Sequence, residues 1–241
     1  MRQFIYSKNS VLERLKQKKE INKILLVSKH AEIEKLARAQ NIEIEYINSK
    51  VADKLVNKTH QGVIAEIPDY KSIDLDQLIQ SLDMTSNPIL VMADQLEDPH
   101  NLGAILRTCD AVGVKGVIIP KNRSVGLNST VARVSTGAIE TVPVSIVTNL
   151  KQAIDKLKQA GFWIVGVDNT ESQDYRLIPS DRPLVIIVGS EKKGISPLLK
   201  KECDYRAKIF MLGSVNSLNV SVATAVMLYS IMEKRVEIQI N

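Results

Sequence analysis

The second half of the sequence carries five short, almost continuously apolar segments, and they restrict the fold more than any other feature. The segments cover residues 89–93, 116–119, 163–167, 184–188 and 207–211. Strands that are apolar on both faces are typical of a parallel sheet with helices on both sides. Helical patterns lie between them, at 102–112, 150–159, 197–202 and 220–234. This alternation predicts an α/β domain built on a parallel sheet.

A smaller α/β pattern comes first in the chain. Apolar strand patterns at 24–28, 42–47 and 62–67 accompany a helical pattern at 32–40. After Pro68 the sequence becomes polar, with one short helical pattern at 75–82. We therefore predict a small N-terminal α/β domain at 1–68, a linker at 69–87 and the parallel-sheet domain at 88–241.

Composition excludes several classes of protein. With 44% hydrophobic and 24% charged residues, the chain can bury a core without metal or disulfide support. Its apolar runs are shorter than the roughly 20 residues of a membrane-spanning helix. The first residues lack the pattern of a secretory signal. The two cysteines, Cys109 and Cys203, suit a reducing compartment, and we expect both to be structural. These features predict a cytoplasmic protein without a membrane span.

Charge and histidine spacing bear on the partner. The histidines, His30, His60 and His100, are too widely spaced for a zinc site, so we expect no metal. The net charge of +5 and the isoelectric point of about 9.1 favour an acidic partner, because Lys and Arg attract phosphate groups. Composition alone does not identify that partner.

The first candidate motif, residues 94–113, directly follows the first of the five apolar strands. We predict that Asn101 caps a helix here and that Gly113 ends it. One face of this helix is apolar, formed by Leu102, Ile105, Leu106, Cys109 and Val112. Arg107 lies outside that face, with five guanidinium donors that can hold a phosphate. The alternative, which the spacing alone favours, is a solvated ion pair with Asp110.

The second candidate motif, residues 189–196, follows the strand at 184–188. Gly189 at the carboxyl end of a strand lets the backbone approach a ligand, and open α/β sheets bind ligands at that edge. The G-x-G-x-x-G spacing is absent, and Glu191 would repel a pyrophosphate, which argues against NAD. The glycine-lysine-serine of a P-loop is also absent, which disfavours a nucleoside triphosphatase. An ordinary strand-to-helix turn is the alternative.

The third candidate motif, residues 209–225, runs from a strand through a polar loop into a helix that contains small residues. Asn216, Ser217 and Asn219 in the loop offer polar groups to a ligand. Taken by itself, this pattern more often forms a capped core helix than a binding site.

Together and in this order, the three motifs resemble those of the SpoU/TrmH family of RNA ribose 2'-O-methyltransferases, part of the SPOUT class. The similarity spans residues 89–234 and includes the intervening segments 122–127, 135–138 and 142–144. Its most diagnostic part is Asn219 within the run Ser-Leu-Asn-Val-Ser-Val-Ala at 217–223.

The N-terminal segment resembles the ribosomal-protein-like substrate-binding domain of the same family, notably at 59–65. Relatives usually begin that domain with a glycine-arginine pair, where this chain has Ser7 and Lys8. The resemblance therefore implies an RNA substrate-binding domain at 1–68 and a methyltransferase catalytic domain at 88–241.

The resemblance also implies a C-terminal trefoil knot in the catalytic domain, with the methyl donor S-adenosylmethionine bent into the knot. Topology rules alone favour an unthreaded, doubly wound sheet, because chains rarely thread themselves. In this family two subunits share each active site, and the apolar helix at 220–232 suits a homodimer.

Site residues follow from the matching positions. The family's cofactor positions match Gly189, Ile209 and Leu218, and Met211 and Ser217 are their neighbours. The backbone at such positions holds most of the cofactor in the family.

The family's central catalytic position matches Arg107. Because a guanidinium group stays protonated in proteins, we expect Arg107 to clamp the RNA phosphate and ribose rather than to act as the base. Asn101, Glu191 and Asn219 match the other active-site positions and would place Arg107 and the RNA backbone.

The RNA substrate follows from the same resemblance. The two-domain length and residues 147–150 are more similar to enzymes that methylate a guanosine of large-subunit (23S) ribosomal RNA than to the shorter transfer-RNA enzymes. Methylation of a transfer-RNA guanosine is the first alternative. A non-catalytic RNA-binding factor for ribosome assembly is the second, and the four matching active-site residues argue against it.

Overall fold

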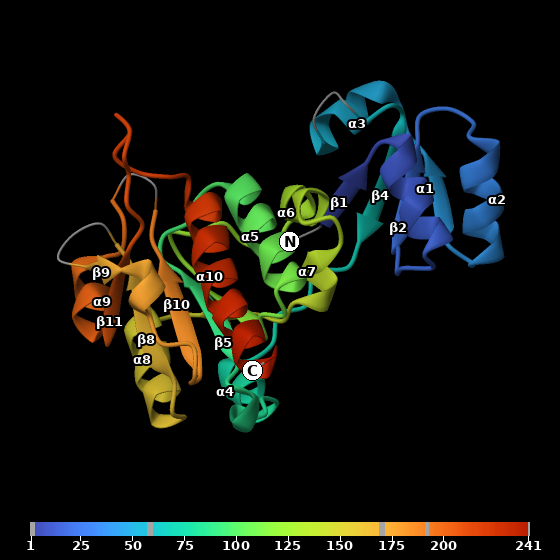
Figure 1. Ribbon diagram of the computed structural model, residues 1–241. Helices are drawn as coiled ribbons and strands as arrows, with labels where there is room; N and C mark the ends of the chain where they lie inside the picture. The colour runs from blue at the N-terminus through green and yellow to red at the C-terminus, as the bar shows by residue number, and fades with distance from the viewer. Residues whose placement is uncertain (1–2, 57–59, 169–171, 191–192, 241) are drawn as a thin grey trace. The chain divides into compact units, whose positions relative to one another are not determined.

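The computed structural model describes residues 3–56, 60–168, 172–190 and 193–240, with side chains as far as residue 236. The chain divides into two compact units, Met1–Tyr70 and Lys71–Asn241 (Figure 1). Each unit has its own sheet and its own core. The predicted α/β fold, with a small N-terminal domain and a parallel-sheet domain, is confirmed.

The N-terminal unit contains a four-stranded sheet in the order β1-β4-β2-β3. β2 and β3 are parallel, whereas β4 is antiparallel to β1 and β2. Its elements are β1 (Gln3–Tyr6), α1 (Lys8–Lys16), β2 (Lys23–Leu26), α2 (Ala31–Ala39), β3 (Glu43–Tyr46), α3 (Ser49–Leu55) and β4 (Val63–Ile67). The sequence patterns predict β2, α2, β3 and β4 but not β1, α1 or α3.

Side-chain alternation along β2 divides the interior of this unit in two. Ile24 and Leu26 face one side, where they pack with buried residues of α1 and α2. Leu25 faces the other side and packs with Ala52 of α3 and Ile64 of β4. The sheet is thus covered on both faces.

Ser7 precedes α1 in a backbone conformation that glycine normally occupies. Its φ is +89°, in the half of φ space that side chains disfavour. Its hydroxyl oxygen caps α1 by accepting a hydrogen bond from the backbone nitrogen of Ser10 at 3.4 Å. Ser7 therefore takes a conformation that favours glycine and at the same time supplies the cap of α1.

The C-terminal unit contains a seven-stranded sheet in the order β7-β6-β5-β10-β8-β11-β9, and all neighbouring strands are parallel. Its strands are β5 (Ile89–Ala93), β6 (Gly116–Pro120), β7 (Val144–Val147), β8 (Trp163–Val167), β9 (Gln173–Asp174), β10 (Leu184–Val188) and β11 (Tyr205–Lys208). Its helices are α4 (Leu75–Gln80), η1 (Met84–Ser86), α5 (Pro99–Ala111), α6 (Ser129–Val134), α7 (Ala138–Thr141), α8 (Leu150–Gln159), η2 (Tyr175–Leu177), α9 (Pro197–Glu202) and α10 (Val220–Ile240).

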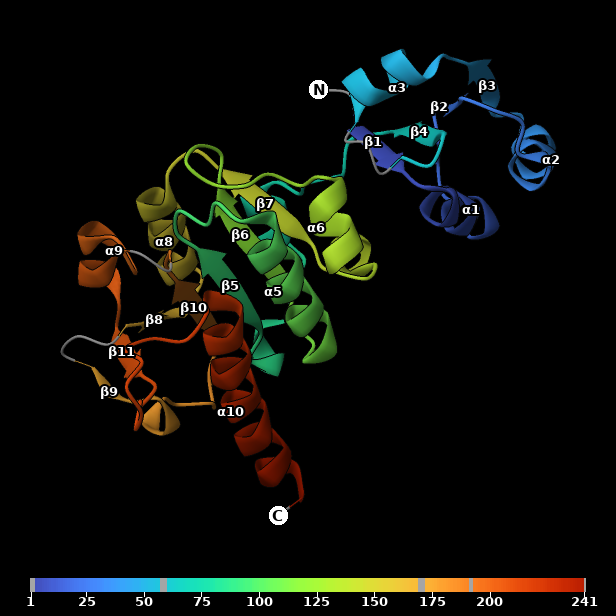
Figure 2. The ribbon, with the colours of Figure 1, turned by 90° about the horizontal axis from the view of Figure 1, so that it is seen from above.

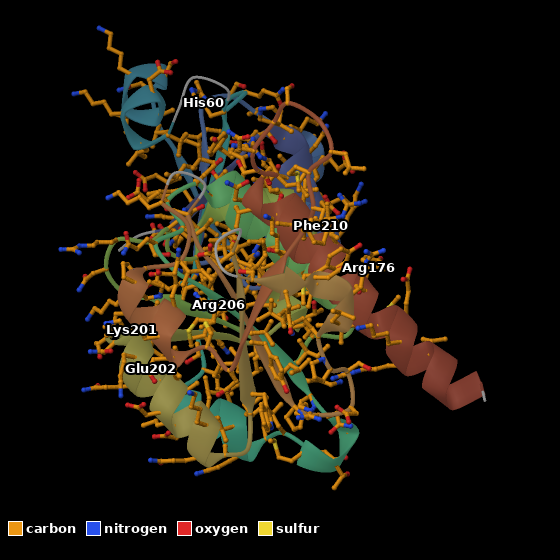
Figure 3. The ribbon with its side chains drawn as sticks, turned by 60° about the vertical axis from the view of Figure 1, so that its left-hand side comes forward. His60, Arg176, Lys201, Glu202, Arg206 and Phe210 are labelled. Carbon is orange, nitrogen blue, oxygen red and sulfur yellow. The ribbon has the colours of Figure 1, made fainter. Side chains whose placement is uncertain are left out.

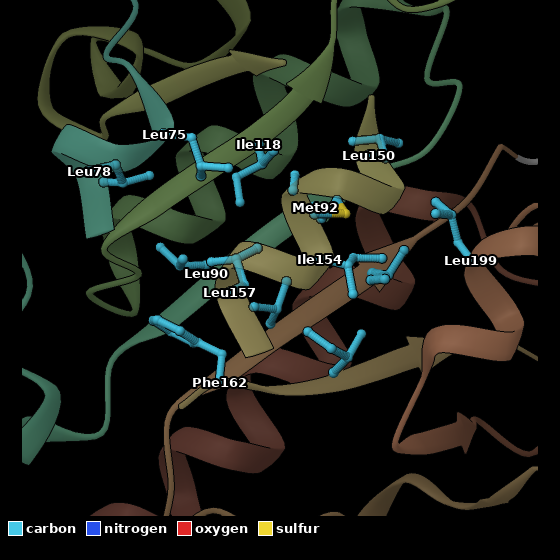
Figure 4. Close-up of a cluster of buried hydrophobic side chains, with 14 of the residues drawn as sticks. Leu75, Leu78, Leu90, Met92, Ile118, Leu150, Ile154, Leu157, Phe162 and Leu199 are labelled. Atoms are coloured by element: carbon cyan, nitrogen blue, oxygen red, sulfur yellow. The ribbon is translucent and has the colours of Figure 1, made fainter. Parts of the chain in front are cut away.

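Helices cover both faces of this parallel sheet (Figure 2). On one face α4, α8 and α9 supply leucines to a core that includes Leu90 and Met92 of β5 (Figure 4). On the other face α5 packs against α6, α7 and α10. Gly103 of α5 allows the close approach of α6, because a Cβ there would lie 2.6 Å from the Cβ of Val134.

The segment 69–87 contains α4 and η1. Leu75 and Leu78 of α4 are buried in the core of the C-terminal unit, and the backbone nitrogen of Ile73 donates to Val144 O at 2.9 Å. Few apolar anchors mark this stretch in the sequence, yet Ile73, Ile79, Leu82 and Met84 also pack against the core of the parallel-sheet unit.

The last helix, α10, has 21 residues and extends beyond the predicted range 220–234. Near its end the Lys234 ammonium donates to Ile178 O, and Arg235 Nε donates to Ser180 O, both at 2.8 Å. No helix within the described residues is long and apolar enough to cross a bilayer. The trefoil knot stays a prediction, consistent with the fold.

Candidate active site

The first motif places α5 directly after β5. Asp98, not Asn101, caps this helix: its carboxylate accepts from the His100 backbone nitrogen at 2.8 Å, and Pro99 occupies the first turn. Asn101 as the cap was wrong, because an Asp followed by Pro starts the helix three residues earlier. Gly113 ends it as predicted, with a φ of +73°.

Asn101 lies inside α5, where only 8% of its surface is exposed. Its side-chain oxygen accepts a hydrogen bond from Asn219 Nδ2 at 2.9 Å. The other end of the Asn219 amide accepts from the backbone nitrogen and the hydroxyl of Ser221, and so it caps α10. The first and third motifs therefore meet, and α10 lies beside α5 (Figure 1).

Arg107 is exposed on α5, whereas Leu102, Ile105, Leu106 and Cys109 of the predicted apolar face are buried. No side chain within the described residues forms a hydrogen bond or ion pair with Arg107. The carboxylate of Asp110 accepts from the Thr141 hydroxyl at 2.6 Å instead. The guanidinium is thus available to a ligand.

The second motif forms a tight loop at the carboxyl end of β10. The Gly194 backbone nitrogen donates to Ser190 O at 2.8 Å, and Gly194 has a φ of +63°. A Cβ at Gly189 would overlap the backbone of Gly194 and Ile195, so only glycine fits there. Glu191, predicted for the catalytic group, lies outside the described residues.

A cavity of about 280 Å³ opens at this edge of the sheet. All five residues predicted to bind the cofactor line it: Gly189, Ile209, Met211, Ser217 and Leu218. Ile209 and Met211 line the cavity, whereas Phe210 between them is 53% exposed (Figure 3). The structure thus brings together residues from the second and third motifs.

The same cavity also contains residues from outside the motifs. Beside the five predicted residues, it is lined by Ser190, Lys193, Gly194, Val220 and Ala223 of the second and third motifs and by Val167, Asp168 and Lys200, which lie outside the motifs. Asp168 directly follows β8, and its place at the carboxyl end of an apolar strand was the signal in the sequence. Lys200 comes from α9 and carried no comparable signal.

Asp94 is a further polar group that holds the site together. It follows β5, is 4% exposed, and its carboxylate accepts from the Ser196 backbone nitrogen at 2.8 Å. Its own backbone nitrogen donates to Val188 O at 2.8 Å. Asp94 therefore connects the first motif to the loop of the second.

The cysteines offer no nucleophile at neutral pH. Burial raises the pKa of the Cys109 thiol to about 12, and mainly burial raises that of Cys203 to about 11. Within the described residues, no three His, Cys, Asp or Glu side chains form a group that could hold a metal ion.

The model of the SpoU rRNA methylase family matches residues 88–229, and the model for RNA 2'-O ribose methyltransferase substrate binding matches residues 4–72. The chain belongs to the SpoU rRNA methylase family. The prediction of a SpoU/TrmH RNA methyltransferase is thereby confirmed.

Relatives and solved structures agree with this assignment. The YacO protein of Bacillus subtilis, named as a TrmH family tRNA/rRNA methyltransferase, is 41% identical over 238 residues, with 96% of each chain covered. A Staphylococcus aureus protein named in the same way is 46% identical over 237 residues, with 96% of each chain covered.

The fold is shared with the SpoU methyltransferase AviRb from Streptomyces viridochromogenes, solved in complex with the cofactor AdoMet. The TM-score is 0.75 at 22% identity, over 97% of this chain and 90% of that one. The TrmH/SpoU tRNA modifying enzyme of A. aeolicus has a TM-score of 0.59 at 34% identity, over 68% of this chain and 83% of that one. AdoMet, the cofactor bound in AviRb, is S-adenosylmethionine, which is the cofactor predicted from the sequence.

The hydrogen bond between Asn219 and Asn101 gives a stability prediction. Asn219→Ala removes a helix cap, worth about 1 kcal/mol, and also removes the hydrogen bond to the largely buried Asn101 amide, worth roughly 0.5–1.5 kcal/mol more. Asn149→Ala is the matched control, because Asn149 caps α8 through the Gln152 backbone nitrogen alone. We expect the larger loss for Asn219→Ala in urea unfolding followed by the fluorescence of Trp163. Equal losses would show that the contact with Asn101 adds nothing.

Proposed function

We propose that this protein transfers the methyl group of S-adenosylmethionine to the 2'-hydroxyl of a guanosine ribose in 23S ribosomal RNA. One observation carries the proposal. Asn219, hydrogen-bonded to Asn101, lies between Leu218 and Val220, which both line the cavity. A polar pair from the predicted catalytic group therefore adjoins the predicted cofactor cavity.

The cavity suits adenosylmethionine in size and chemistry. Its volume of about 280 Å³ lies near the lower end of the range for small-molecule sites. Ile209, Met211, Leu218, Val220 and Ala223 offer apolar contacts to an adenine ring. Its other lining residues are mainly polar or charged, and they match the hydroxyl, amino and carboxylate groups of the rest of the molecule.

The chain's own residues position the RNA. Bound adenosylmethionine supplies an electrophilic sulfonium methyl group. Arg107 holds a phosphate beside the target ribose through its planar donors and sets the 2'-hydroxyl in line for attack. Because the guanidinium stays protonated, the hydroxyl proton leaves toward the RNA phosphate and solvent. Asn101, Glu191 and Asn219 place Arg107 and the RNA backbone.

Several observations favour ribosomal RNA as substrate. The substrate-binding family model matches residues 4–72, and we propose that domain 1–68 selects the RNA, 69–87 links the domains and 88–241 catalyses transfer. The A. aeolicus tRNA modifying enzyme aligns with 68% of this chain, whereas an rRNA methyltransferase from Sinorhizobium meliloti aligns with 97%. Since ribosomal RNA is the proposed substrate, we place the protein in the cytoplasm.

The function is tested by mapping 2'-O-methylation across total RNA from cells with and without the gene. We expect one guanosine of 23S ribosomal RNA to lose its methyl group and to regain it when the wild-type gene is restored. Loss at a transfer-RNA guanosine instead would establish the alternative substrate. An unchanged methylation map would support a non-catalytic RNA-binding role.

Arg107 gives the sharpest test of the mechanism. Arg107→Ala should lower the single-turnover rate at saturating RNA and cofactor by about 100-fold or more, because the hydroxyl is no longer aligned. Arg107→Lys should restore little, since an ammonium group lacks the planar fork of donors. Arg176→Ala, which removes an arginine outside the motifs, is the control and should keep the wild-type rate. Near-normal transfer by Arg107→Ala would rule out the clamp.

We also propose a homodimer formed through α10. Val222, Tyr229 and Val236 lie seven residues apart on this helix and are 47%, 43% and 45% exposed. A spacing of seven places them on one face, where an apolar stripe suits a second copy of the chain. Tyr229→Glu should give monomers in sedimentation and abolish methyl transfer. A fully active monomer at assay concentration would contradict the shared site.

A further inference from the structure

Asp168 stands out among the residues that line the cavity. It directly follows β8, and its backbone nitrogen donates to Ala207 O at 3.0 Å, so the carboxyl edge of the sheet fixes its position. Its side chain is only 6% exposed. The cavity thus has an almost fully buried carboxylate in its wall.

Lys200 of α9 forms an ion pair with this carboxylate, with 2.5 Å between Nζ and Oδ2. Removing a charge pair from water costs free energy that the attraction between the two charges often fails to repay. An apolar pair of similar size would serve the packing of α9 against β8 at least as well. The ion pair in a ligand cavity therefore indicates a role in binding rather than in stability.

We propose that Asp168 binds the ribose hydroxyls of the adenosyl group, with Lys200 as its positioning residue. An ionised carboxylate has two acceptor oxygens, and a carboxylate at the carboxyl end of a parallel strand is a known solution for holding a ribose diol. This inference rests on the proposed function, because it takes adenosylmethionine as the ligand of this cavity.

The ion pair also decides which part of the ligand Asp168 receives. Adenosylmethionine offers the carboxylate two kinds of donor, the neutral ribose hydroxyls and the cationic α-amino group. Lys200 already balances the charge of Asp168 and would repel a second cation beside it. Neutral hydroxyl donors are therefore favoured over the ammonium group.

Gly194 keeps space open next to this carboxylate. A Cβ built on Gly194 would lie 3.9 Å from Asp168 Oδ2, so a longer side chain there would grow toward the proposed ribose position. The apolar residues Leu218, Val220 and Ala223 belong to the same cavity and offer a surface for the adenine ring attached to that ribose.

Calorimetry on the purified full-length protein tests this assignment with S-adenosylhomocysteine and its 2'-deoxy and 3'-deoxy analogues. Wild-type protein should bind at least one deoxy analogue about 10- to 100-fold more weakly, the loss expected for charge-assisted hydrogen bonds. Asp168→Asn should weaken binding of S-adenosylhomocysteine by a similar factor and should bind that deoxy analogue with little further loss. Lys200→Gln should reduce the difference in affinity between S-adenosylhomocysteine and that deoxy analogue.

The matched control is Asp174→Asn, which breaks an ion pair with Arg176 outside the cavity and should leave all affinities unchanged. The deoxy analogues test wild-type protein directly, so the result does not depend on whether Asp168→Asn folds. Equal binding of the parent ligand and both deoxy analogues would overturn the assignment. A second result would also overturn it. If Asp168→Asn lost affinity for every ligand except an analogue that lacks the α-amino group, Asp168 would bind that amino group and not the ribose. If wild-type protein binds neither S-adenosylmethionine nor S-adenosylhomocysteine, the proposed function itself fails.

Discussion

The hydrogen bond between Asn219 and Asn101 connects segments 118 residues apart, and the arrangement of the site depends on it. Asn219 is the last residue before α10, so its side chain fixes where that helix starts and how it meets α5. Asn219 also directly follows Leu218, which lines the cavity. If the amide pair were lost, the start of α10 and one wall of the cavity would lose a shared anchor, and a largely buried polar group would lose a partner.

Two carboxylates support this arrangement from β5 and β8, the strands on either side of β10. Asp94 after β5 holds the loop of the second motif through the Ser196 backbone nitrogen, and Asp168 after β8 meets Lys200 of α9. Both lie at the carboxyl edge, where a parallel sheet leaves the ends of its strands open to loops and ligands. The two carboxylates at this edge therefore have different roles. Asp94 ties loops together, whereas Asp168 faces the ligand cavity.

The sequence predicts those parts of the fold in which all residues are buried in the same way. The strands that are apolar on both faces and the apolar face of α5 follow from the local pattern, because every residue there must be apolar to be buried. Asn101 shows the limit. Asp98 and Asn101 both suit a helix cap, and the contact of Asn101 with Asn219, 118 residues away, is not visible in the local sequence. The ion pair of Asp168 with Lys200 could not be predicted from the sequence either. It joins β8 to α9 through space, and no local spacing indicates it.

The separate cores of the two units bear on how such a protein can change its RNA target. Buried residues of the N-terminal core come from that unit alone, and all residues that line the cavity at Gly189 come from the other unit. Lys8 is one surface position of the N-terminal unit: it is exposed at the start of α1, directly after the capping residue Ser7. If residues 1–68 select the RNA as proposed, the substrate can change through such surface positions while the methyl-transfer site stays the same.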